Sequence, residues 1–276
     1  MSYAKLVDVT KCTACRACMV ACKNWNDLPS DSQAYGGTYQ SHTKCDGKTW
    51  NVLQMKEYET SSGGFEWLFR HQACMHCEEA ACEKVCPESA ISTTSLGNVV
   101  IDQEKCVGCS YCTQNCPFDV VELAEYVTED GETVERAQKC TMCDGRIQAG
   151  LQPACADICG MDAIVFGKKE EMKKLAEARL NEVKDRYPNA QIYDPAGVDG
   201  THTFYLLAED PAVYDLPENP KVPVSAVVWK DYAQPMGKAL LGVTTMAVMT
   251  GYITNKLFNK EGHAEEGGQT DETDKE

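Results

Sequence analysis

"CVGCSYCTQNCP" (Cys106–Pro117) is the stretch that decides the fold. Its four cysteines are spaced C-x2-C-x2-C-x3-C, and a proline directly follows the last one. A self-comparison finds three more cysteine quartets along the chain. The four quartets take every one of the 17 cysteines except Cys45. The other three quartets are Cys12, Cys15, Cys18 and Cys22; Cys74, Cys77, Cys82 and Cys86; and Cys140, Cys143, Cys155 and Cys159.

A run with this spacing binds a [4Fe-4S] cluster of the bacterial ferredoxin type. Three of its thiolates hold one cluster, and the fourth cysteine ligates the neighbouring cluster. The proline fixes the turn and offers no competing N–H group. The quartets are therefore expected to work in pairs, each pair exchanging its last cysteine.

A structural zinc site is the alternative, because two cysteine pairs separated by a loop can bind zinc. Zinc has no use for the internal third cysteine of the first and third quartets. The fourth quartet alone leaves zinc open, because its middle gap is eleven residues long. If the second and third quartets pair as neighbours, the first must pair with the fourth. Cys140, Cys143 and Cys155 would then serve one cluster, and Cys159 would complete the cluster of the first quartet.

The predicted fold class is α+β, with two nested ferredoxin-like modules that bind two [4Fe-4S] clusters each. The outer module comprises residues 1–68 and 132–187, and the inner module comprises residues 69–131. A β-hairpin is predicted in the inner module, with strands at Ala90–Thr93 and Val99–Asp102.

A matching strand at Asp162–Gly167 is predicted after the fourth quartet, and a helix is predicted directly after it. Apolar residues at helical spacing begin at Met172, and Pro188 ends the pattern. We expect this helix to pack one face on the cluster domain and to leave its charged face in solvent.

The C-terminal part is predicted to lie outside the cluster modules. Residues 188–235 are rich in Pro, Asp and Gly and suggest a docking arm. Residues 236–258 suggest a transmembrane helix, because 22 residues span about 33 Å and a bilayer core is about 30 Å thick. Threonines make this segment only moderately apolar, so a buried soluble helix is the alternative. Residues 259–276 suggest an acidic disordered tail.

Composition excludes several classes of protein. A formal net charge of -16 argues against nucleic-acid binding. An odd cysteine count does not suit a disulfide framework. The N-terminus shows no signal peptide, so the chain is expected to be cytosolic or to be exported already folded with a partner.

No catalytic residues are predicted. The sequence has no Gly-rich phosphate loop and no nucleophile–base pair, and no metal site is expected apart from the cluster irons. His76 within "CMHC" is expected to be a packing residue, and Cys45 an unpaired structural thiol. Lysines lie near several cysteines in sequence, but no single one can be assigned to a cluster; they are Lys5, Lys11, Lys23, Lys105 and Lys139. Four clusters without other chemistry indicate electron conduction.

Further motifs carry a resemblance to a known family. They are "ACKNWND" (21–27), "EWLFR" (66–70), "CMHCE" (74–78), "CVGCSYCTQNCPF" (106–118), "FGKKEEM" (166–172), "GVDGTH" (197–202) and "LPENPKVPVSAVVWK" (216–230). With the nested quartets, these motifs resemble the iron-sulfur (β) subunit of membrane-bound formate dehydrogenases. That family falls within the wider group of four-cluster subunits of molybdopterin oxidoreductases.

The resemblance implies four [4Fe-4S] clusters in a line, each with its own ligand set. Cluster 1 would be bound by Cys12, Cys15, Cys18 and Cys159. Cluster 2 would be bound by Cys22, Cys140, Cys143 and Cys155. Cluster 3 would be bound by Cys74, Cys77, Cys82 and Cys116. Cluster 4 would be bound by Cys86, Cys106, Cys109 and Cys112.

The resemblance also implies partners and a location. Electrons from formate oxidation at a molybdenum or tungsten bis-pterin catalytic (α) subunit would pass to a membrane cytochrome b (γ) subunit and then to quinone. A single C-terminal transmembrane helix would anchor the chain in the inner membrane. The clusters would lie on the extracytoplasmic face and the tail in the cytoplasm.

Two other functions remain open at this point. The chain could be the equivalent subunit of another molybdo-oxidoreductase, such as a sulfur-compound or nitrate reductase. It could also be a soluble polyferredoxin that carries electrons. The hydrophobic C-terminal segment counts against both.

Overall fold

The computed structural model describes residues 2–30, 37, 39–40, 42–59, 63–224 and 228–262. The chain divides into two compact units, Met1–Ala226 and Val227–Glu276, and each is described by itself.

A four-stranded mixed sheet forms the centre of the first unit. Its strands run in the order β8-β1-β10-β9. β1 pairs antiparallel with β8 and parallel with β10, and β10 pairs antiparallel with β9. The bounds are β1 (Tyr3–Asp8), β8 (Ile164–Lys168), β9 (Gln191–Tyr193) and β10 (Thr203–Leu207).

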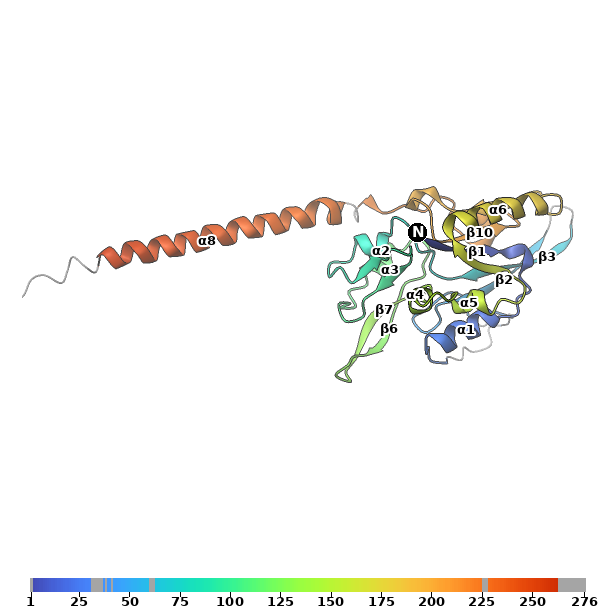
Figure 1. The fold of residues 1–276 in the computed structure, drawn as a ribbon, viewed down its shortest axis with the longest axis horizontal. Coiled ribbons are helices and arrows are strands. Elements are labelled where there is room, and N and C mark those ends of the chain that lie inside the picture. The colour runs from blue at the N-terminus through green and yellow to red at the C-terminus, as the bar shows by residue number, and fades with distance from the viewer. Residues whose placement is uncertain are drawn as a thin grey trace, which may run out of the picture. The chain divides into compact units, whose positions relative to one another are not determined.

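The sheet separates a helix from the cysteine-rich part of the unit (Figure 1). Successive side chains of a strand point to opposite faces. On one face, Ala4 and Leu6 of β1 pack with α6 (Lys169–Val183). On the other face, Val7 packs in a core that includes Cys155. The predicted helix after the fourth quartet is therefore confirmed as α6, and the predicted strand before it is confirmed as β8.

Three two-stranded hairpins complete the strands of the first unit. The predicted hairpin of the inner module is confirmed, because Ile91 pairs with Ile101 in antiparallel register. Gly97 lies in its turn with a φ of +97°, a conformation that favours glycine. The hairpins are β2 (Val52–Glu59) with β3 (Phe65–Gln72), β4 (Ile91–Thr93) with β5 (Val99–Ile101), and β6 (Glu122–Val127) with β7 (Thr133–Gln138).

Short helices lie next to the cysteine runs. The α-helices are α1 (Ala17–Trp25), α2 (Ala81–Lys84), α3 (Tyr111–Asn115), α4 (Asp144–Gln148) and α5 (Ala154–Asp157). The 3-10 helices are η1 (Val9–Lys11), η2 (Ala196–Val198) and η3 (Pro211–Tyr214).

The expectation of a docking arm over residues 188–235 needs correction, because part of this segment belongs to the core. β10 is a central strand of the sheet, and the side chains of Phe204, Tyr205, Leu206 and Leu207 are wholly buried. A strand buried on both faces reads as a continuous apolar run, which "TFYLL" is. Composition obscured this strand, because the turn-forming residues around it are Pro, Asp and Gly.

The second unit contains η4 (Val228–Ala233), a π-helix, and α8 (Gln234–Gly262), which is 29 residues long. The prediction of a helix over residues 236–258 is confirmed. Its apolar side chains are exposed, among them Leu240, Leu241 and Val243. None of the helices in the described residues is long and apolar enough to cross a membrane, so the transmembrane prediction gains no support. Residues 263–276, most of the predicted acidic tail, lie outside the described residues.

The physical reason for this result lies in the polar residues of α8. Threonine hydroxyls interrupt its apolar surface and donate hydrogen bonds to carbonyl oxygens of the preceding turn, as Thr250 does to Met246 at 2.8 Å. Such bonds satisfy the hydroxyls locally, but threonine contributes less apolar surface than leucine or valine does.

Candidate metal centres

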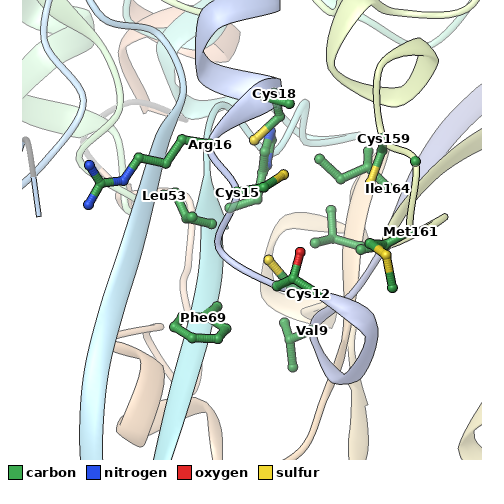
Figure 2. Close-up of a pocket in the computed structure, with 16 residues that line it drawn as sticks. Val9, Cys12, Cys15, Arg16, Cys18, Leu53, Phe69, Cys159, Met161 and Ile164 are labelled. Atoms are coloured by element: carbon green, nitrogen blue, oxygen red, sulfur yellow. The ribbon is translucent and has the colours of Figure 1, made fainter. Parts of the chain in front are cut away.

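The first cavity is lined by Cys12, Cys15, Cys18 and Cys159, the four residues expected to bind cluster 1. Figure 2 shows these side chains around one space, with Phe69 and Ile164 among the apolar residues beside them. The structure thus brings a cysteine from the end of the fourth quartet next to three cysteines of the first.

Backbone conformation positions the thiols of this cavity. Cys12, Cys15 and Cys18 lie where the chain passes from η1 into α1, and Cys159 follows α5, which contacts α1. Ala14 and Arg16 adopt left-handed conformations with φ of 56° and 62°. Such residues curl the loop tightly, and the three cysteines therefore face one centre.

The second cavity is lined by four buried cysteines. They are Cys22, Cys140, Cys143 and Cys155, the set expected for cluster 2. Cys22 comes from α1, whereas the other three come from the fourth quartet. Two ionisable side chains, Lys5 and His71, also line this cavity.

A further cavity is lined by the set expected for cluster 4, namely Cys86, Cys106, Cys109 and Cys112. Ser110, between Cys109 and Cys112, has a φ of 61° and repeats the left-handed turn before α3.

The four cysteines expected for cluster 3 are neighbours as well. Burial raises the pKa of the Cys77 thiol, and the adjacent sulfurs raise it further; these are Cys74, Cys82 and Cys116. An electrostatic effect of this kind requires that the sulfurs lie close together, so the third set also converges on one place.

Backbone N–H groups are directed at several of these sulfurs. The amide of Met142 donates to Cys140 Sγ at 3.3 Å, and that of Ala90 donates to Cys86 Sγ at 3.2 Å. The amide of Ala137 in β7 donates to Cys106 Sγ at 3.4 Å. Such donors stabilise negative charge on sulfur and tune a bound cluster. The sulfurs are therefore prepared to act as thiolates.

Burial opposes the thiolate form when no metal is bound. It raises the pKa of Cys143 to about 11, with the Cys140 sulfur adding to the effect. It also raises the pKa of Cys112 to about 12, helped by the neighbouring Cys106. Because the thiolate is the metal ligand, loading must release protons, and the positive iron must replace them.

A single-ion site does not fit the arrangement of these side chains. Among the described residues, no group of three or more His, Cys, Asp or Glu side chains is arranged to hold a metal ion. Four thiolates around one zinc ion would each lie about 2.3 Å from it. The cysteines instead stand around wider spaces, which suit a group with several iron atoms.

The remaining residues named from the sequence have simpler environments. Cys45 is buried, and its thiol donates to the carbonyl oxygen of Gln72 at 3.3 Å. His76 is fully buried, and its Nδ1 accepts a hydrogen bond from the amide of Val99 at 3.0 Å. Lys105 is exposed and pairs with Asp102 at 2.7 Å.

Sequence reasoning missed the special position of Lys5 and did not consider His71. Both ring nitrogens of His71 are buried without a hydrogen-bond partner among the described residues, and the ring lines both the first and the second cavity. A signal for Lys5 was present, because it occupies the same strand face as Val7 in "YAKLVD". Strand alternation would have placed it inward.

Comparison with known proteins agrees with this geometry. Family models described as "4Fe-4S dicluster domain" match residues 11–90 and 65–169. Two dicluster domains fit four [4Fe-4S] clusters.

Relatives with known names cover most of the chain. A formate dehydrogenase iron-sulfur subunit of Haemophilus influenzae is 41% identical over 260 residues, which is 92% of this chain and 81% of the relative. The formate dehydrogenase-O iron-sulfur subunit of Escherichia coli is 42% identical over 255 residues, 91% of this chain and 82% of the relative. A putative dimethyl sulfoxide reductase iron-sulfur protein of Halobacterium salinarum is 33% identical over 220 residues, 75% of this chain and 80% of the relative. The chain therefore belongs to the family of formate dehydrogenase iron-sulfur subunits, and it transfers electrons through four [4Fe-4S] clusters.

Proposed function

We propose that the chain conducts electrons from a formate-oxidising subunit with a molybdenum or tungsten bis-pterin site to a membrane cytochrome b subunit and then to quinone. The observation that carries this proposal is the continuous series of neighbouring cysteine sets within the first unit. The names of the relatives support formate as the electron source.

Each cluster is assigned one of the four cysteine sets. Cluster 1 takes Cys12, Cys15, Cys18 and Cys159. Cluster 2 takes Cys22, Cys140, Cys143 and Cys155. Cluster 3 takes Cys74, Cys77, Cys82 and Cys116. Cluster 4 takes Cys86, Cys106, Cys109 and Cys112. When bound, the clusters supply one-electron redox chemistry, and the chain provides ligands, burial and hydrogen bonds.

Contacts between the sets support the order 1-2-3-4. The first and second sets are neighbours, because His71 lines both cavities. The second and third sets meet where Cys140 and Cys74 share one core cluster. The third and fourth sets share another core, which contains Cys112 and borders Cys82.

Exposure of the ligands supports entry and exit of electrons at the two ends of this series. Cys15 of the first set and Cys109 of the fourth are exposed, whereas all four cysteines of the second set are buried. Exposed apolar side chains lie near both ends in sequence, with Met161 close to the first set and Val107 within the fourth. Each end is proposed to face a different partner subunit.

We further propose that α8 attaches the chain to its membrane partner. Its exposed apolar side chains need a covering surface, and Ala247 and Gly251 form a small-xxx-small pair that suits close packing on another helix. The family resemblance supports an inner-membrane location, with the cluster unit on the extracytoplasmic face and the tail in the cytoplasm.

Purification from detergent-solubilised membranes tests this function. A large pterin-containing subunit and a haem-containing subunit are expected to copurify, and formate is expected to reduce the clusters. The chain should carry about sixteen iron and about sixteen acid-labile sulfide atoms. Recovery of a fully loaded chain without a pterin subunit would instead support a polyferredoxin carrier. A pterin partner inactive with formate but active with a sulfoxide would support the second molybdo-oxidoreductase function.

A further inference from the structure

Lys5 lies in the middle of β1 and has no exposed surface. It pairs with Phe166 of β8 and with Thr203 of β10, so both of its neighbouring strands shield it from solvent. It shares the strand face of Val7, which is the face toward the cysteines. A buried ammonium group is costly unless an anion or hydrogen-bond acceptors compensate it.

The ammonium group of Lys5 has no such compensation from the described protein atoms. Its Nζ has no hydrogen-bond partner among them. Lys5 instead lines the second cavity, together with the four cysteines assigned to cluster 2. Burial alone would lower the pKa of Lys5, but the sulfurs of Cys155 and Cys140 raise it above the ordinary value.

The other buried side chains nearby differ from Lys5 in charge or in pairing. Burial and the charge of Lys5 hold the pKa of His71 well below its ordinary value, so His71 is neutral. Lys139 is also buried, but its Nζ donates to the carbonyl oxygens of Val99 and Cys140. Lys5 is thus a buried cation that lines the second cavity without a protein partner in the described residues.

We propose that Lys5 is a positioning residue for cluster 2, with its ammonium group donating to cluster sulfur and raising the reduction potential of that cluster. An oxidised [4Fe-4S] core with four thiolates carries a charge of about −2, and one-electron reduction makes it more negative. A fixed positive charge in a low-dielectric interior stabilises the reduced form more than the oxidised form. The electron comes from a neighbouring cluster, and no covalent bond forms or breaks. The inference rests on the proposed ligand set of cluster 2.

EPR-monitored redox titration of the purified holo-complex tests the inference. Lys5→Met removes the charge and keeps a side chain of similar length, whereas Lys5→Arg keeps the charge. In Lys5→Met, one of four clusters is expected to become at least tenfold harder to reduce, a fall of about 59 mV for a one-electron couple. The other three potentials should stay unchanged, and Lys5→Arg should restore most of the shift.

Two further variants make the result specific. Lys105→Met removes an exposed lysine that adjoins Cys106, and it should move no potential. Cys22→Ser should abolish or alter the same EPR signal that Lys5→Met shifts, because Cys22 belongs to the assigned ligand set.

The outcomes separate this inference from the proposed function. Four clusters with unchanged potentials in Lys5→Met would overturn the role of Lys5 and leave the proposed electron relay intact. A wild-type complex without four cubane clusters would overturn the proposed relay itself. If Lys5→Met fails to fold, pulsed EPR of the reduced wild-type complex with ¹⁵Nζ-labelled lysine decides the question. A ¹⁵N coupling to one cluster supports the role of Lys5, and its absence overturns it.

Discussion

Replacing Cys159 with serine is expected to remove cluster 1 and to leave cluster 2 in place. Cys159 lines the first cavity, whereas Cys155, four residues earlier, lines the second. Serine keeps the size of the side chain but replaces the soft thiolate that iron-sulfur clusters require. Because one of four cysteine sets is broken, the iron content should fall by about a quarter, from about sixteen to about twelve atoms per chain.

The assay combines iron and acid-labile sulfide analysis with EPR of the reduced protein. Cys155→Ser is the matched control, since it should remove a comparable amount of iron but a different EPR signal. Loss of the same signal in both variants would show that the two cysteines serve one cluster. That result would refute the exchange of the last cysteine between the first and fourth quartets.

Three further predictions concern stability. Asp8→Ala should lower the free energy of unfolding by about 2–3 kcal/mol, because Asp8 is buried, caps η1 and accepts from Arg179 Nε at 3.0 Å; Asp210→Ala, which removes only the cap of η3, should cost about 1 kcal/mol, and equal costs in urea titrations would count against the ion pair. Leu206→Ala should cost about 2–5 kcal/mol because the side chain is wholly buried in β10, whereas Leu175→Ala on exposed α6 surface should cost under about 1 kcal/mol, and similar losses in both would place β10 outside the core. The metal-free chain should lose stability as the pH rises from 9.0 toward about 11, because burial raises the pKa of Cys143 from 9.0 to about 11 and the folded state then binds more protons than the unfolded state; stability below pH 9.0 should not depend on this thiol, and a rise in stability above pH 9.0 in thermal melts would refute the assignment.

Much of the cysteine chemistry could be predicted because ligand spacing is a local property of the chain. The pattern C-x2-C-x2-C-x3-C, with left-handed residues such as Ala14 and Ser110 between the ligands, dictates how one loop surrounds one centre. The hairpin at Ile91–Ile101 was equally local, with a glycine at the turn.

Features that depend on distant contacts could not be predicted in this way. β1 pairs with β10 almost two hundred residues later, as Lys5 pairs with Thr203, and no local pattern encodes that partner. Sequence proximity to cysteines also could not separate buried Lys5 from exposed Lys105, because burial depends on the assembled sheet. The apolarity of α8 lay close to the margin for a membrane span, and length alone did not decide it.

The nesting of the cysteine sets has a consequence for the order in which the growing chain can acquire its cofactors. With the proposed ligand sets, clusters 3 and 4 have all their ligands once Cys116 has left the ribosome. Clusters 1 and 2 begin at the N-terminus but must wait for Cys155 and Cys159. At ~5–20 residues per second, that interval lasts about two to nine seconds. During it, the thiols of Cys12 to Cys22 are synthesised but incomplete as sites, so a scaffold that delivers iron and sulfide must fill the inner pair first.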